Sequence, residues 1–76
     1  AVAYGQTELE SAAEQGSIET LIIEAGLLRS QTFWAEVASS VRVNGGQVVQ
    51  ASADHDAGEE LIGLGGAIGL LRWSLE

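Results

Sequence analysis

Gly16-Ser17-Ile18-Glu19-Thr20-Leu21-Ile22-Ile23 is the stretch that decides the fold of this 76-residue chain. Ile18 to Ile23 is short, β-branched and almost wholly apolar, which is typical of a strand buried on both faces of a sheet. Gly16 stands where a preceding helix needs a residue in the left-handed conformation in order to end. The stretch therefore predicts a helix, a glycine turn and a buried strand, which is the basic unit of an α/β fold.

Helices are predicted on both sides of this strand. Before it, Thr7 and Glu10 have the spacing of a capping box, in which each side chain satisfies a free backbone N–H at the helix start. After it, a second helix is expected to end at Asn44-Gly45-Gly46. The apolar residues at helical spacing are Leu9, Ala12 and Ala13 in the first helix and Trp34, Val37, Ala38 and Val41 in the second, with Phe33 beside them.

The rest of the chain is expected to add two strands and a third helix. Gln47 to Ser52 predicts a strand, and a helix is expected from about Asp56 to Leu64, with Asp54 or Asp56 as its cap and Gly65-Gly66 as its stop. Ala67 to Leu75 predicts the last strand, with Leu71, Trp73 and Leu75 on one face. The order α-β-α-β-α-β indicates a layered α/β fold.

We expect residues 1–76 to form a single domain that lacks an N-terminal portion. Three predicted strands are few for a complete sheet, and Ala1 is not a natural start residue. At this size the core is thin, because a domain of about 60 residues buries only about 60% of the surface its unfolded chain exposes.

The residue inventory argues against several kinds of structure. There is no cysteine for a disulfide, and a single histidine without cysteine cannot make a structural zinc site. The longest apolar runs are only a few residues, so we expect no membrane span. Absence of cysteine fits a cytoplasmic protein.

Charge is the most informative part of the composition. Eleven acidic residues face Arg29, Arg42 and Arg72, there is no lysine, and the formal net charge is −8. Nucleic-acid binding needs several Lys or Arg contacts to phosphates, so this balance disfavours it. It favours a basic partner, or a solvent whose salt screens self-repulsion. The absence of lysine together with the acid excess resembles the proteomes of salt-accumulating archaea.

The segments that invite a chemical interpretation fail on spacing or on the number of ligands. Gly63 to Gly69 has Ile68 where a dinucleotide-binding turn needs its last glycine, and it follows a helix instead of a strand. Asp54-His55-Asp56 places three consecutive residues that rarely point at one centre, so a helix-capping turn is expected. Ser52 and Ser74 lack the Gly-x-Ser-x-Gly context of a nucleophile. We therefore expect no catalytic residue, no cofactor and no metal.

Several stretches, in one register, resemble the C-terminal domain of Pelota and the class-one release factors. They are Val2-Ala3-Tyr4-Gly5, Gly16 to Ile23, Asn44 to Val49, Ser52 to Leu61, and Leu64 to Arg72. Together they cover nearly the whole chain, and the resemblance implies a three-layer α/β/α sandwich with a small mixed sheet, similar to kink-turn-binding ribosomal proteins.

Two features favour an archaeal Pelota within this family. Ile23 reaches Phe33 in ten residues, without the minidomain that release factors usually insert there. His55, three residues before Gly58, also follows the Pelota pattern. The sequence departs from the family at Glu24, where Asp or Ser is usual, and at residues 67–69, which read Ala-Ile-Gly.

The resemblance implies a non-catalytic docking domain of ribosome rescue in no-go and non-stop mRNA surveillance. In the family this domain binds a translational GTPase of the elongation factor 1 alpha type, and the parent protein acts with the ribosome and a ribosome-recycling ATPase. The contact residues of the family correspond to Tyr4 and Glu60. Tyr4 precedes a glycine, and its ring and hydroxyl suit an interface anchor.

Two alternatives stay open. One is the C-terminal domain of an archaeal class-one release factor, which serves normal termination. The other is an RNA-binding domain like that of a ribosomal protein, which needs a basic loop that this sequence lacks.

RNA affinity measured against salt tests the second alternative. We expect no measurable binding of the 76-residue chain to a structured RNA hairpin at either 50 mM or 200 mM salt. A protein with six to ten phosphate contacts loses about 10³–10⁵ in affinity across that range. Tight binding with such a slope would establish the RNA-binding alternative instead.

Overall fold

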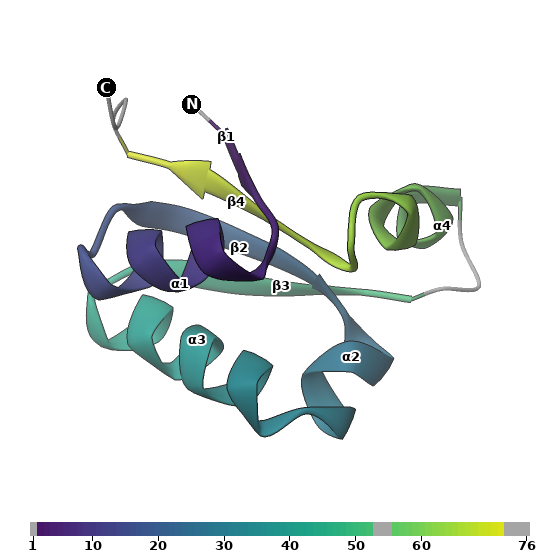
Figure 1. The fold of residues 1–76 in the computed structure, drawn as a ribbon, viewed down its shortest axis with the longest axis horizontal. Helices are drawn as coiled ribbons and strands as arrows, with labels where there is room; N and C mark the ends of the chain where they lie inside the picture. The colour runs from purple at the N-terminus through teal and green to yellow at the C-terminus, as the bar shows by residue number, and fades with distance from the viewer. Residues whose placement is uncertain (1, 53–55, 73–76) are drawn as a thin grey trace.

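One mixed sheet organises the part of the chain that the computed structural model describes, residues 2–52 and 56–72 (Figure 1). Within those residues the sheet has four strands in the order β1-β4-β2-β3, in which β2 and β3 are parallel and β4 is antiparallel to β1 and β2. The elements in chain order are β1 (Val2–Tyr4), α1 (Gln6–Glu14), β2 (Ile18–Glu24), α2 (Ala25–Ser30), α3 (Thr32–Val43), β3 (Gln47–Ala51), α4 (Asp56–Gly63) and β4 (Ala67–Leu71). The predicted α/β class and small mixed sheet are confirmed.

Strand β2 lies between β3 and β4 and carries an irregularity at Glu19. Ile18 pairs with Leu71 and Thr20 with Leu70, so Glu19 is the extra residue of a β-bulge. Because of the bulge, Ile18 faces the same side of the sheet as Leu21. Both side chains are at most 1% exposed, since they lie under the helices.

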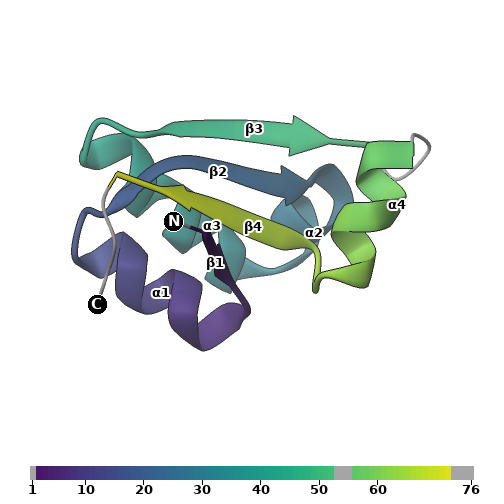
Figure 2. The ribbon, with the colours of Figure 1, turned by 90° about the horizontal axis from the view of Figure 1, so that it is seen from above.

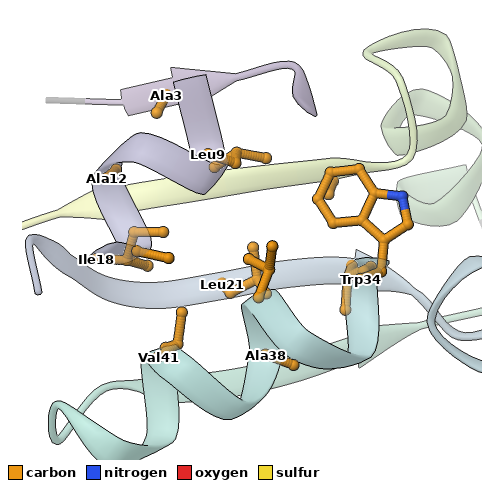
Figure 3. Packing of buried hydrophobic residues seen from close by; sticks show 12 residues of the cluster. Ala3, Leu9, Ala12, Ile18, Leu21, Trp34, Ala38 and Val41 are labelled. Carbon is orange, nitrogen blue, oxygen red and sulfur yellow. The ribbon is translucent and has the colours of Figure 1, made fainter. Parts of the chain in front are cut away.

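Helices α1 and α3 cover one face of the sheet and form the core with it (Figure 3). Every apolar residue predicted at helical spacing in these two helices is buried. Trp34 is 4% exposed, and the partly buried Phe33 meets its ring edge-on, with centroids 5.0 Å apart. Burial of a large apolar side chain stabilises the fold by about 1.5–3 kcal/mol.

Helices α1, α3 and α4 end in the same backbone motif. At the end of α1, the Gly16 N–H donates to the Ala13 carbonyl and the Ser17 N–H to the Ala12 carbonyl, which is a Schellman motif. Gly45 and Gly65 hold the corresponding place in α3 and α4, and φ is +68° at Gly16, +84° at Gly45 and +99° at Gly65. The predicted glycine stops at all three helix ends are confirmed.

The second face of the sheet is largely open. Val2, Tyr4, Val49 and Leu70 lie on it and are 39–46% exposed. Helix α4 lies at one end of the sheet, apart from α1 and α3 (Figure 2), and buries Leu61 outside the main core cluster. The prediction that the central strand is buried on both faces therefore holds for one face only, because Ile22 on the open face is half-buried.

Three further predictions about the elements were wrong. The capping box is not formed: α1 begins at Gln6, its N-cap is Gly5, and no side chain bonds its first turn. The three-strand count missed β1, which exists through its pairing with β4. The predicted element order also missed α2. Asp54 and residues 73–75, which include the predicted end of the last strand, lie outside the described residues.

Gly46→Ala and Gly63→Ala should shift stability in opposite directions. A Cβ at Gly46 would lie 2.6 Å from the Ile18 carbonyl oxygen and 2.7 Å from Val41 Cγ1, so alanine would force β2 and α3 apart. We expect a loss of about 1–3 kcal/mol. A Cβ at Gly63 meets nothing within 4 Å, and alanine in that helical position should add about 0.4–1 kcal/mol. Urea unfolding followed by tryptophan fluorescence measures both, and equal shifts would contradict the close packing at Gly46.

Candidate partner-binding site

Tyr4 ends the edge strand β1 and projects from the open face of the sheet. Ala3 beside it is fully buried and faces the core, so the alternation of the strand turns Tyr4 to the other side, opposite Ile68 of β4. The Tyr4 side chain is 46% exposed, as expected from the sequence. The exposed part is free to meet a partner.

Gly5 fixes the position of Tyr4. Its φ of +84° and ψ of 156° are accessible almost only to glycine, and they turn the chain from β1 into α1 without an intervening loop. A Cβ at Gly5 would meet nothing within 4 Å, so the backbone conformation and not crowding requires glycine there. The Leu9 N–H donates to the Gly5 carbonyl at 3.0 Å and anchors the turn.

Glu60 lies in the middle of α4 and is exposed. Its neighbour Leu61 is 4% exposed and anchors the helix against the sheet, whereas Glu59 and Glu60 are both exposed. Neither the Glu60 carboxylate nor the Tyr4 hydroxyl makes a hydrogen bond or ion pair with any described residue. The Tyr4 and Glu60 side chains do not contact each other in the structure. Strand β4 connects the elements that carry them, because β4 follows α4 in the chain and pairs with β1.

Two adjoining grooves open at the α4 end of the sheet. The larger has a volume of about 450 Å³ and lies between α2 and α4. The smaller, of about 290 Å³, runs toward the start of α1. Leu27 and Gly65 line both. The larger groove is also lined by Glu24, Gly26, Ser30, Ile62 and Gly66, and the smaller by Gly5, Gln6, Gln31 and Trp34.

Glu24 shapes the larger groove by capping α2. Its carboxylate accepts hydrogen bonds from the backbone N–H groups of Gly26 and Leu27, and its own N–H donates to the Gly66 carbonyl at 2.9 Å. A Cβ at Gly26 would lie 2.7 Å from a Glu24 carboxylate oxygen, so the glycine makes room for this long capping side chain. Glu24, where the resemblance led us to expect Asp or Ser, thus serves as the N-cap of α2.

The residues of the larger groove were missed by the sequence analysis. Ile62 could have been noticed in the sequence, because it is a large apolar residue directly beside Leu61 and only one of the two faces the sheet. In the structure Leu61 is buried and Ile62 is 52% exposed. The role of Leu27 could not have been found, since α2 itself was not predicted.

A third groove, between α1 and α3, is acidic. Glu10, Glu14 and Glu36 line it together with Phe33, and its volume is about 170 Å³. No group of three His, Cys, Asp or Glu residues within residues 2–52 and 56–72 is arranged to hold a metal ion. Asp54 and His55, which were weighed as a metal half-site, lie outside the described residues. None of the described helices is long and apolar enough to cross a membrane.

Comparison with known proteins finds relatives over almost the whole of this chain. The model of the family eRF1 domain 3 matches residues 1–75. The Pelota homologue of Thermococcus onnurineus is 40% identical over 77 residues, which cover 99% of this chain and 22% of that protein. The chain therefore spans about a fifth of the length of the relatives it matches.

Solved structures give the same grouping. Archaeal Pelota, in a structure of its ribosome-bound state with ABCE1, is 39% identical, with a TM-score of 0.91 over 99% of this chain and 22% of that one. Dom34 of S. cerevisiae, a translation termination-like factor that interacts with Hbs1, is 33% identical, with a TM-score of 0.89 over 97% of this chain and 22% of its own. The archaeal termination factor aRF1 is less similar, at 27% identity and a TM-score of 0.77 over 95% of this chain and 20% of that one.

Replacing Glu24 tests its capping role. Glu24→Ala removes both hydrogen bonds at the start of α2 and should cost about 0.5–2 kcal/mol, whereas Glu24→Asp keeps a carboxylate acceptor and should stay close to wild type. Glu19→Ala, at an exposed position of the same strand, is the control. Urea unfolding gives all three values, and an equal loss for Glu24→Ala and Glu24→Asp would argue against the cap.

Proposed function

The chain belongs to the eRF1 domain 3 family, and on that premise we propose that it is the docking domain of a Pelota-like ribosome rescue factor. Its partner is a translational GTPase of the elongation factor 1 alpha type, bound through the surface that carries Tyr4 and Glu60. The domain supplies binding energy and positioning for that GTPase and no bond-making chemistry of its own.

Exposed, unbonded Tyr4 on an apolar sheet face is the observation that carries this proposal. Interfaces bury aromatic anchors in an apolar centre and surround them with polar groups. Val2 and Leu70 lie on the same face as Tyr4 and are 42% and 39% exposed. Among the solved relatives, Dom34 interacts with Hbs1, which supports a protein partner for this type of domain.

The negative net charge of the chain supports an ion pair between Glu60 and a basic residue of the partner. The net charge of −8 attracts cationic surfaces, and Glu60 has no competing cation among the described residues. An Arg or Lys of the partner would pair with it. Such a pair contributes about 0–1 kcal/mol at an exposed rim and more where water is excluded.

The wider role belongs to the parent protein. The similar archaeal Pelota is bound to the ribosome together with ABCE1, and this chain corresponds to 22% of that Pelota chain. In our proposal the remainder of a rescue factor contacts the ribosome in the cytoplasm, and GTP hydrolysis by the docked GTPase precedes subunit splitting by a recycling ATPase.

The release-factor alternative is less well supported. The Pelota structure has a higher TM-score and identity than aRF1, and a six-residue helix followed directly by α3 occupies the place where release factors usually carry a minidomain. The RNA-binding alternative lacks a basic surface. Arg72 donates to the Asn44 carbonyl at 2.9 Å, at the end of α3 that also carries Arg42, whereas Arg29 lies in α2.

Titration calorimetry of the 76-residue chain with the GTP-bound GTPase in high salt tests the docking role. We expect micromolar or tighter binding, weakened at least tenfold by Tyr4→Glu, which places a charge at the anchor, and by Glu60→Arg, which reverses the charge that meets the partner. Glu19→Arg makes the same charge change at the exposed bulge residue of β2 and should bind like wild type. Circular dichroism checks that each variant is folded.

Two results would count against the proposal. Absence of binding by the folded wild type would remove it. Equal weakening by Glu60→Arg and Glu19→Arg would show that only net charge matters and that Glu60 has no specific contact.

A further inference from the structure

The grooves beside α4 run between residues that adjoin the proposed docking surface, although neither Tyr4 nor Glu60 lines them. The smaller groove begins at Gly5, the residue next to Tyr4. The larger ends at Ile62 in α4, the helix that carries Glu60. Leu27 and Gly65 line both grooves. We therefore treat the two grooves as one, and call it the α2–α4 trough.

Glycine backbone forms much of this trough. Gly26, Gly65 and Gly66 all line it. A Cβ at Gly66 would lie 2.5 Å from Leu27 Cδ2, so a side chain there would displace the leucine that lines both grooves. Within the described residues, the groove side chains that could cover this backbone are Leu27, which packs partly on the core, and Ile62, which is 52% exposed.

The lining selects an apolar occupant. The one charged side chain of the lining is Glu24, and its carboxylate is already engaged by the N–H groups of Gly26 and Leu27. A small polar ligand would need convergent polar groups to orient it, and the larger groove offers mainly Leu27, Ile62 and glycine backbone. An apolar side chain gains free energy there by leaving water.

The rim of the trough is acidic. Glu59 lies three residues before Ile62, on the same side of α4, and is exposed. The chain as a whole carries a net charge of −8. A second copy of this chain would bring like charges together, whereas a segment with Arg or Lys next to its apolar residue is attracted.

We infer that the α2–α4 trough receives an apolar side chain of the GTPase, flanked in the partner by a basic residue that meets the acidic rim of α4. This inference rests on the proposed function and deepens it, since it names the chemistry of the partner segment. Glu59 is then the rim carboxylate that the basic residue meets.

Ile62→Asp is the decisive variant. The residue is half-exposed, so the fold should survive, and the added charge should weaken binding of the GTP-bound GTPase at least tenfold. Ile62→Leu should bind like wild type, because it keeps an apolar wall of similar volume. Val43→Asp is the matched control: it makes the same change at an exposed residue at the far end of α3, 82% exposed, and should leave affinity within twofold. In ¹³C-methyl spectra, the signals of Leu27 and Ile62 should shift on addition of the GTPase and that of Val43 should not.

The outcomes separate this inference from the docking proposal. If Tyr4→Glu weakens binding while Ile62→Asp does not, and the Leu27 methyl signals stay in place, docking stands and the trough is not used. If the wild type does not bind at all, the docking proposal fails and this inference fails with it. If Ile62→Asp abolishes self-association detected by sedimentation, a second copy occupies the trough and the inference is overturned.

Discussion

Burial of one face of β2 is the constraint on which the rest of the structure depends. Ile18, Leu21 and Ile23 are each at most 1% exposed, and the bulge at Glu19 is what brings Ile18 to the same side as the other two. Helices α1 and α3 form the opposite wall of this core. The glycine that ends each of these helices lets the chain return at once to the sheet, which is how a chain this short closes a core on one side of a sheet.

Because the helices cover only one face of the sheet, the candidate binding surface lies on the other face and at the α4 end. The open face keeps half-exposed apolar residues, and the loops that turn the chain at the α4 end of the sheet meet around Leu27 and Gly65. Tyr4 lies at this end because it is the last residue of the edge strand β1. Helix α4 lies there because it leads directly into β4, which pairs with β1. The order of the strands in the sheet, and no local sequence motif, therefore brings the parts of the candidate site to the same end of the molecule.

Much of the fold could be predicted because its signals are local. Helical spacing identified the buried residues of α1 and α3, and glycines marked the three helix ends. Strand β1 could not be predicted from its three residues, because only pairing with β4 makes it a strand. The Thr7–Glu10 spacing was misleading since Gly5, with its positive φ, starts α1 before Thr7. Helix α2 depends on Glu24 folding back over Gly26, which no capping rule for short side chains foresees. Tyr4 and Glu60 came from the family resemblance, whereas the trough arises from tertiary packing and leaves no sequence pattern.

The exposed acidic residues among the described ones lie mainly on the helices. Helices α1 and α3 present Glu8, Glu10, Glu14 and Glu36 to solvent, while the acidic residues of the described strands are Glu19 at the bulge and Glu24, whose carboxylate is engaged by α2. Helix α4 adds Glu59 and Glu60, and Arg42 lies on α3, so the charge is spread unevenly over the helices and gives the domain an electric dipole moment. In the field of a charged particle the domain experiences a torque, so it is oriented before any contact forms, and added salt weakens this orientation as the screening length shortens. The acidic helices thus influence how an encounter begins, although α1 and α3 lie on the side of the molecule away from the open sheet face.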